Sequence, residues 1–536
     1  MLKPPRYSAL AVTFVASLTA VSGQQHAHAV PSIPQELLER PIAERSGIGR
    51  AHDAVSTKSA TAQTFYDQGL NYLHGYVWIE AARSFNQALR SDPNLAMAHV
   101  GLTFAYTELN KPELAASALA RARALAGTAS PHDRAHIDAR ALQAAAELAP
   151  RDPAKLHAYR KSLDDALARQ PADAELLILR GIAESPDPAD RGQGSAASAI
   201  PFYTKALGAG GTAAEHYLTH ALENANRTGE ALPHAAAYAR AAPNIPHALH
   251  MRGHVLRRSG QIEAAMGAFE AADRAASTYF QAENVPPEYD WHYEHNLDLL
   301  GSSYRYVGRM TDAARTLQRA FELPSILLVQ MYNKRTWPDF LIARGRADEA
   351  VAASRTLIAH PVTLVRAVGH IEAGRAYLAS GRFDSSASES NLALGELRAA
   401  ADGQALVAPA LQQLQGEFFV RTGQREKGRA MLEALTTRLR GLPGPDNWVQ
   451  ALFTLEAIAQ TARDAGAWDL ARWAAEQMIA HDPNYAGSHF ARALAAAHDG
   501  DTAQAATEFA AAAERWRTAD ATLPELAQAR RASARR

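Results

Sequence analysis

The sequence predicts an all-α protein, a right-handed α-solenoid of about ten helical hairpins stacked in series. Two observations predict this class. Hydrophobic residues make up 47% of the 536 residues, but alanine dominates them and aromatic residues are only 7%, a composition that suits closely packed helices. In addition, small residues and aromatic residues recur at a fixed period of 34 residues, which is the length of one helix-turn-helix repeat.

The first 29 residues have the features of a secretory signal peptide. Lys3 and Arg6 make the start positive, an apolar stretch covers residues 9–21, and Ala27-His28-Ala29 is a small-x-small cleavage site. We therefore expect cleavage near Ala29 and a secreted or periplasmic mature protein.

The segment FYDQGLNYLHGYVWIEAARSFNQALRSDP is typical of the tetratricopeptide repeat (TPR). The positions that match are Phe65, Gly69, Tyr72, Ala81, Phe85, Ala88 and Pro93. Small residues let the two helices of a hairpin approach closely, aromatic residues fill the space beside them, and proline ends the second helix. Further copies of the pattern predict a chain made of repeats almost throughout.

We divide the chain by this period. The predicted parts are a signal peptide (1–29), an N-terminal extension (30–60), TPR repeats (61–129), a helical segment out of phase (130–211), histidine-rich TPR repeats (212–325) with an inserted loop at about 277–291, C-terminal TPR repeats (326–516) and a basic tail (517–536). The loop is predicted because Gly260 and Gly308 are 48 residues apart, 14 more than one repeat.

Two short motifs predict helix starts. Ser130 to Asp133 places a serine cap before a proline and an acidic residue in the first turn. Thr212 and Glu215 have the spacing of a capping box, which predicts that the threonine side chain caps the next helix.

Composition excludes several classes of function. The chain has no cysteine, which rules out disulfides and thiolate metal ligands. It has 55 basic and 56 acidic residues, so its charge gives no reason to expect nucleic acid as a partner. After the signal peptide, no apolar run is long enough to predict a transmembrane segment.

Histidines are concentrated in the repeats between residues 216 and 295. Of the 21 histidines, seven form three sets with spacings of three or four residues. The sets are His216 and His220; His247, His250 and His254; and His292 and His295. Because residues three or four apart lie on one face of a helix, each set is expected to form a stripe.

The repeat pattern predicts which face these stripes occupy. In TPR proteins the first helix of each hairpin lines the concave groove. When the repeat is numbered from Gly253, His247, His250 and His254 fall at groove positions. In the preceding repeat, Glu223 falls at a groove position as well. Asp298 occupies such a position after His295. Three neighbouring helices are therefore expected to direct imidazoles and carboxylates to one patch.

Such a patch is compatible with two kinds of site. Imidazole with carboxylate is a ligand set for Zn, Cu, Fe or Ni, and seven histidines are enough for two ions, or for one ion with supporting histidines. Groove histidines also serve as ordinary polar contacts for a bound ligand. The sequence leaves both interpretations open.

The chain also resembles a bacterial histidine-rich group of TPR proteins related to tetratricopeptide repeat protein 38. The resemblance covers about residues 45–325 and rests on the segment from Ala62 to Gly101 and on HYLTHALE, HALHMRGHVLRRSG and HYEHNL. It implies a shared groove site at His216, His220, His247, His250, His254 and His295. It implies no particular reaction.

Two hypotheses of function follow. The first is an exported TPR solenoid whose concave groove binds a protein segment, a peptide or another ligand. The second is a metalloprotein, a hydrolase or an oxidoreductase, that uses the histidine cluster. A scaffold that uses its convex face is a third alternative.

Overall fold

A computed structural model describes residues 33–325, 328–400, 403–442 and 445–534. Across this part of the chain the regular elements are helices, and no strand occurs. The predicted signal peptide lies outside the described residues. The helices form two compact units: among the described residues, one holds 33–303 and 316–330, and the other holds 304–315 and the chain from 331 onward. We call them the first unit and the second unit.

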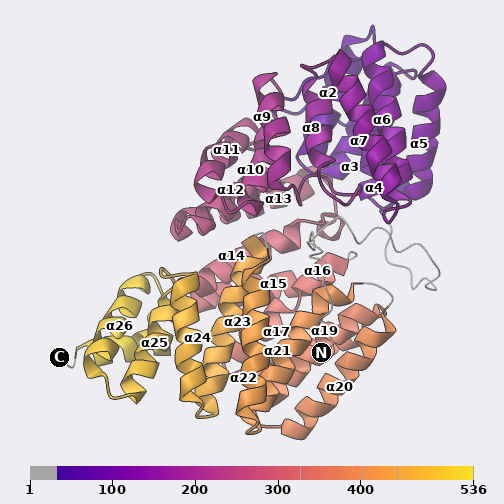
Figure 1. Ribbon diagram of the computed structural model, residues 1–536. Helices are drawn as coiled ribbons and strands as arrows, with labels where there is room; N and C mark the ends of the chain where they lie inside the picture. Colours follow the sequence, from indigo (N-terminus) through magenta and orange to yellow (C-terminus); the bar gives the residue numbers. More distant parts are fainter. Residues whose placement is uncertain (1–32, 326–327, 401–402, 443–444, 535–536) are drawn as a thin grey trace, which may run out of the picture. The chain divides into compact units, whose positions relative to one another are not determined.

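The first unit is a series of antiparallel helix pairs, seen as neighbouring coils in Figure 1. Its helices are α1 (Gln35–Glu39), α2 (Ala60–His74), α3 (Trp78–Ser91), α4 (Ala96–Glu108), α5 (Pro112–Leu125), α6 (Pro131–Glu147), α7 (Pro153–Arg169), α8 (Ala174–Ile182), α9 (Ile200–Gly208), α10 (Ala214–Asn224), α11 (Thr228–Ala241), α12 (Pro246–Arg258) and α13 (Ile262–Glu283). Within it, α2 packs on α3, α4 on α5, and so on to α12 on α13.

The second unit continues the same arrangement. Its helices are α17 (Thr336–Ala343), α18 (Ala347–Ile358), α19 (Thr363–Ala379), α20 (Phe383–Ala399), α21 (Gln404–Arg421), α22 (Arg425–Arg440), α23 (Pro445–Asp464), α24 (Trp468–His481), α25 (Ala486–His498), α26 (Thr502–Arg515) and α27 (Pro524–Ser533). Three further helices are α14 (Tyr293–Tyr306), α15 (Met310–Glu322) and α16 (Leu328–Asn333). The predicted fold class, an all-α solenoid of TPR-like hairpins, is confirmed.

The glycines of the repeat act as the sequence pattern predicts. A β-carbon on Gly69 of α2 would lie 2.6 Å from the ring of Phe85, and one on Gly101 of α4 would lie 2.4 Å from the same ring. Phe85 is fully buried between these helices. The missing side chains therefore make the space that the aromatic ring of the hairpin fills.

Of the two predicted helix starts, one is confirmed and one is wrong. The Ser130 hydroxyl accepts a hydrogen bond from the backbone N–H of Asp133, as a capping residue does. In contrast, α10 begins at Ala214 with no side-chain cap, so Thr212 does not cap it. The backbone N–H of Glu215 donates to the backbone oxygen of Thr212 at 3.3 Å, and the carboxylate of Glu215 pairs with Nδ1 of His234 at 2.5 Å, so neither hydrogen bond of a capping box forms.

The inserted loop is shorter than predicted, because α13 continues through Glu283. Ala276 and Phe280 are buried in the core of the first repeats, and this burial extends the helix. The chain then turns at Asn284, whose φ of 47° is left-handed, and forms a short 3-10 helix over Pro287–Tyr289. The insertion is therefore mostly extra helix, followed by a short connection.

The ends of the described chain are also packed. In the predicted N-terminal extension, α1 packs on α3 and buries Leu38. In the predicted basic tail, α27 buries Leu526 with Trp516, while Arg530 and Arg531 stay exposed. The predicted basic tail thus includes a helix with a buried apolar face and a basic outer face.

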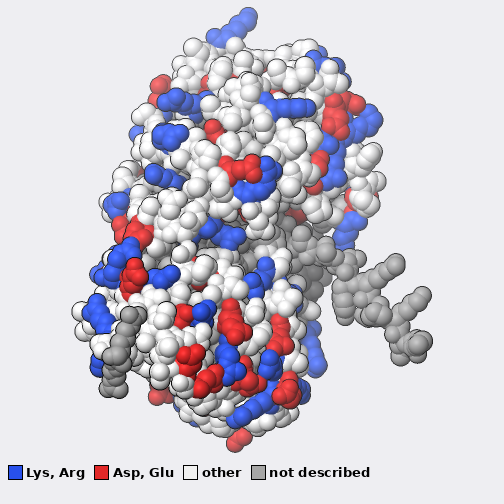
Figure 2. All heavy atoms as spheres, turned by 60° about the vertical axis from the view of Figure 1, so that its left-hand side comes forward, with Lys and Arg blue, Asp and Glu red and all other residues white. Residues whose placement is uncertain are grey.

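The surface has no dominant charge. Figure 2 shows Lys and Arg side chains interspersed with Asp and Glu on the face in view. Among the described residues, no helix is both long enough and apolar enough to cross a membrane.

Candidate metal centre

The seven predicted histidines lie together in the first unit, on three neighbouring segments of the chain. His216 and His220 are on α10, three are on α12, and His292 and His295 are at the start of α14. Six of the seven residues are between 0% and 9% exposed, and His295 is half-buried. The stripes that the sequence predicts therefore face into the packed helices and not into solvent.

Three imidazoles converge on one point. Nε2 of His216 lies 3.0 Å from Nε2 of His247 and 3.0 Å from Nε2 of His220. A ring nitrogen carries either one hydrogen or one lone pair, so only one of these contacts can be an ordinary hydrogen bond. Three imidazoles that bind one zinc ion at 2.0–2.1 Å have nitrogens about 3.3 Å apart, close to the separation observed.

A second set of three lies beside the first. Candidate ligand nitrogens of His250, His254 and His295 all lie within 4.8 Å of one another. The ring centres of His250 and His254 are 4.3 Å apart, and those of His250 and His295 are 5.0 Å apart. Two groups of three imidazoles, one drawn from α10 and α12 and the other from α12 and α14, thus adjoin on α12.

His292 connects the two groups. Its ring centre is 4.6 Å from that of His247 and 4.0 Å from that of His250, nearly perpendicular to both. Its Nε2 is buried and has no hydrogen-bond partner among the described residues. The side chain can therefore supply a further nitrogen to either group.

Asn296 determines which nitrogen of His250 is unprotonated. The amide Nδ2 of Asn296 donates to the backbone oxygen of Phe269 at 3.1 Å, which leaves the amide oxygen to accept from Nδ1–H of His250 at 2.9 Å. Because a neutral imidazole has one N–H, the lone pair of His250 is then on Nε2. Metal-binding histidines commonly have this arrangement, in which the second nitrogen donates to a fixed oxygen.

The two predicted carboxylates occupy different positions. Glu223 is buried on α10, and its Oε2 lies 3.7 Å from Nδ1 of His254, so the structure brings it into the cluster. Its Oε1 has no hydrogen-bond partner in the described part of the chain. Asp298 is half-buried on α14, one turn after His295, and its backbone oxygen accepts from Ser302 at 2.6 Å.

Burial keeps these imidazoles unprotonated. Desolvation, followed by the proximity of His254, lowers the pKa of His220 to about 3. Desolvation also lowers the pKa of His216, His247, His250 and His292 well below its ordinary value of 6.5. At neutral pH these five imidazoles therefore present lone pairs, which is the state that metal ions bind.

Aromatic side chains that the sequence analysis did not single out enclose the cluster. The ring of Tyr238 stacks on that of His216 at 4.7 Å, and the ring of Tyr76 lies 4.6 Å from it. Tyr76 has a φ of 58°, an unfavourable backbone conformation for a tyrosine, which the turn between α2 and α3 imposes. Nothing in the local sequence around Tyr76 predicts this contact, because it joins repeats that are far apart in the chain.

Another cluster in the first unit has a different character. Asp53, His132 and His136 also have candidate ligand atoms within 4.8 Å of one another. Here Nε2 of His132 pairs with Asp53 and its Nδ1 with Asp133, both at 2.9 Å, and these hydrogen bonds raise the pKa of His132 to about 10. A protonated imidazole has no lone pair, so this group is an ion-pair network.

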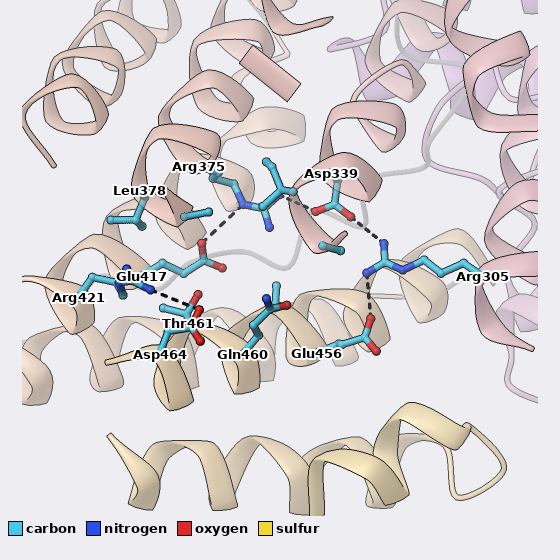
Figure 3. Close-up of a pocket in the computed structure, with 14 residues that line it drawn as sticks. Arg305, Asp339, Arg375, Leu378, Glu417, Arg421, Glu456, Gln460, Thr461 and Asp464 are labelled. Atoms are coloured by element: carbon cyan, nitrogen blue, oxygen red, sulfur yellow. Dashed lines mark hydrogen bonds and ion pairs between the residues drawn. The ribbon is translucent and has the colours of Figure 1, made fainter. Parts of the chain in front are cut away.

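The second unit contains a polar pocket, shown in Figure 3. Labelled lining residues are Arg305, Asp339, Arg375, Leu378, Glu417, Arg421, Glu456, Gln460, Thr461 and Asp464. They come from the first helices of successive hairpins, α17, α19, α21 and α23, together with the end of α14. Arginines and carboxylates alternate, and Asp339 pairs with both Arg305 (3.0 Å) and Arg375 (2.7 Å). No sequence motif predicts this pocket.

No protein-family model matches the sequence, and no curated protein sequence is similar to it. Solved structures with similar helical repeats include a human IFIT1 dimer with PPP-AAAA, at 10% identity and a TM-score of 0.36, covering 85% of this chain and 91% of that one. Yeast Tom70 matches at 13% identity and a TM-score of 0.33, covering 88% and 96%. A tetratricopeptide repeat protein from Parabacteroides merdae matches at 14% identity and a TM-score of 0.28, covering 54% and 98%. Likenesses this distant carry no argument about the site, and the resemblance to the histidine-rich group stays a prediction.

Proposed function

We propose that the first unit is a metalloprotein that binds two adjacent divalent transition-metal ions through its seven buried histidines. The observation that carries the proposal is that Nε2 of His216 lies 3.0 Å from Nε2 of both His220 and His247 in a buried group, beside a second group of three imidazoles. His216, His220 and His247 would bind one ion. His250, His254 and His295 would bind the other, with His292 between them.

The cost of burying these side chains supports the proposal. A buried polar atom without a hydrogen bond costs about 1–3 kcal/mol. Within the described residues, such atoms include His292 Nε2 and both ring nitrogens of His254. Several such atoms in one cluster are expensive for a protein that uses these residues only for packing, whereas bound ions would use the lone pairs.

The ligand set limits both the metal and the chemistry. Neutral imidazoles with one buried carboxylate, Glu223, suit Zn, Cu, Fe or Ni. Three protein ligands per ion leave at least one coordination position for water or a substrate. A bound zinc ion would activate water coordinated at that position, and a redox-active ion would supply electron transfer. The first would suit a hydrolase and the second an oxidoreductase.

Metal content tests this proposal directly. The mature protein, purified without a histidine tag, should contain or take up close to two ions per chain, measured by mass spectrometry of the metals. A variant with His250→Ala and His254→Ala should keep one ion, bound by the first group. A control variant with His52→Ala and His157→Ala, two exposed histidines, should keep both. A wild-type protein that binds none of Zn, Co, Cu, Ni or Fe(II) would refute the proposal.

Binding of a protein segment is a second candidate function, and the polar pocket of the second unit favours it. Its lining comes from the first helices of successive hairpins, the helices expected to form a TPR groove, and it has charges of both signs along its length. Selection from a peptide library with the wild-type protein, repeated with Arg421→Glu, would test it. Peptides selected equally by both proteins would argue against this pocket as the binding site.

A further inference from the structure

The first unit contains an apolar pocket next to the histidine cluster. None of the seven histidines of the cluster lines this pocket. Its volume is about 680 Å³, a figure that includes open solvent at the mouth. Six aromatic side chains line it: Tyr66, Tyr76, Trp78, Phe85, Phe104 and Tyr217. Aliphatic side chains of α2, α4 and α8 complete the lining, so the pocket favours an aromatic guest over a polar one.

One wall of this pocket is shared with the histidine cluster. The ring of Tyr76 lies 4.6 Å from that of His216 and 4.9 Å from that of His247. The ring of Tyr217 lies 5.0 Å from that of His216. A molecule in the pocket would therefore be separated from the first group of imidazoles by a single layer of tyrosine rings.

One polar feature of the pocket is a chain of three hydrogen-bonded side chains. Nδ1 of His74 lies 2.8 Å from the hydroxyl oxygen of Tyr217, and its Nε2 lies 3.0 Å from Oε2 of Glu175. A carboxylate accepts the Nε2–H, so Nδ1 carries the lone pair and Tyr217 donates to it. The hydroxyl oxygen of Tyr217 can then accept a hydrogen bond from a guest.

The charged groups at the pocket are already paired. Arg191 forms ion pairs with Glu108 at 2.8 Å and with Glu147 at 2.7 Å. Glu175 is held by His74 at 3.0 Å, and His136, which also lines the pocket, lies 3.3 Å from Asp173. An ionic guest would have to compete with these pairs, so the lining selects for a neutral molecule.

We infer that this pocket binds a small uncharged aromatic molecule that carries a hydroxyl group, with the ring between the aromatic side chains and the hydroxyl donating to Tyr217. Binding in the pocket is independent of the metal proposal. The further statement that this molecule lies beside the metal centre, as a substrate would, rests on the proposed function.

Binding of 2-naphthol to the metal-free mature protein tests the pocket, with naphthalene as the matched probe that lacks the hydroxyl. We expect saturable binding of 2-naphthol at one site per chain, followed by its fluorescence. Tyr217→Phe should weaken 2-naphthol binding about 5- to 10-fold, the usual effect of losing one hydrogen bond, and should change naphthalene binding less than 2-fold. Equal effects on the two probes, or no saturable binding by the wild-type protein, would overturn the inference.

Filling the pocket is the second test. Leu73→Trp places a larger side chain in the lining and should weaken both probes at least about 10-fold. Leu148→Trp adds the same side chain at a position that is 88% exposed and should leave both affinities unchanged. If Leu73→Trp does not fold, as judged by circular dichroism, the comparison of probes with Tyr217→Phe still decides the matter.

A paramagnetic ion tests the position of the pocket relative to the metal centre. Protein loaded with Cu(II) should quench bound 2-naphthol strongly, whereas Zn(II) should not. Absence of bound copper in metal analysis would count against the proposed function alone. Bound copper without quenching would overturn the placement of the pocket beside the centre.

Discussion

The hydrogen bond between Asn296 and His250 offers the sharpest test of the proposed metal centre. Asn296→Leu keeps nearly the same side-chain size but removes the oxygen that accepts from Nδ1–H at 2.9 Å. Without this partner, the His250 ring can rotate and can place its proton on either nitrogen. Asn296 is not itself a proposed ligand, so the variant keeps all seven histidines.

The expected magnitude follows from the role of such hydrogen bonds. Loss of the fixed oxygen behind a histidine ligand lowers metal affinity about 10- to 100-fold, which corresponds to about 1.4–2.7 kcal/mol. The effect should be confined to the ion bound by His250, His254 and His295. The cost to folding should be about 1 kcal/mol, because one buried hydrogen bond to the Phe269 backbone is also lost.

Competition between the protein and a chelator of known affinity measures both sites, with Co(II) absorption reporting the number of nitrogen ligands. Asn224→Leu is a matched control, because the amide of Asn224 donates to the backbone oxygens of Gln193 and Ser195 at 2.8 and 3.1 Å. It should lose similar stability without losing metal. If wild-type protein binds two ions and Asn296→Leu binds both with unchanged affinity, the assigned orientation of His250 is wrong.

Three further predictions concern stability. Gly69→Ala should lower the free energy of unfolding by about 1–3 kcal/mol in urea titrations, because the new β-carbon would lie 2.6 Å from the Phe85 ring, whereas Gly127→Ala, with no atom within 4 Å, should have almost no effect. His132 has a pKa of about 10 in the folded protein and 6.5 in the unfolded chain. Its protonation therefore adds about 1–2 kcal/mol to the free energy of unfolding below pH 6.5, and this stabilisation is lost as the pH rises through 10. His132→Gln should flatten the dependence of the free energy of unfolding on pH between 6.5 and 10, and an unchanged slope would contradict the ion-pair assignment. Burial opposes ionisation of Asp339, but its two arginine partners outweigh burial and lower the pKa of Asp339 from 3.8 to about 2. The ionised carboxylate therefore stabilises the second unit by about 2 kcal/mol above pH 3.8, and this stabilisation disappears as the pH falls through 2. Asp339→Asn should therefore destabilise the protein at pH 7 and have little effect at pH 2, as followed by thermal unfolding.

Much of the fold could be predicted because it repeats. A pattern of small and aromatic residues at a period of 34 specifies the close approach within each hairpin, as the contact of Gly69 with Phe85 illustrates. The stripes of histidines were predictable for a similar reason, since spacings of three and four residues are set by the geometry of a single helix. The out-of-phase start at Ser130 was also a local property, satisfied by its own hydrogen bond to Asp133.

Predictions failed where a side chain had a choice of partners. The Thr212 and Glu215 spacing predicts a capping box, but Glu215 pairs with His234 on the next helix, which no local pattern indicates. The extent of the inserted loop was wrong for the same reason, because Phe280 is buried against the first repeats and keeps the chain helical.

By itself, the sequence determined the helices, their repeat and the fact that each set of histidines shares one helix face, because these depend on residues a few positions apart. Only the tertiary structure decided that the histidines are buried and not displayed, and that Nε2 atoms from α10 and α12 meet at 3.0 Å. It also decided the contact between His74 and Tyr217, 143 residues apart in the chain. Such contacts depend on how successive hairpins pack and on the backbone conformation of turns such as the one at Tyr76. A small change in the packing or in a turn moves a side chain by several ångströms.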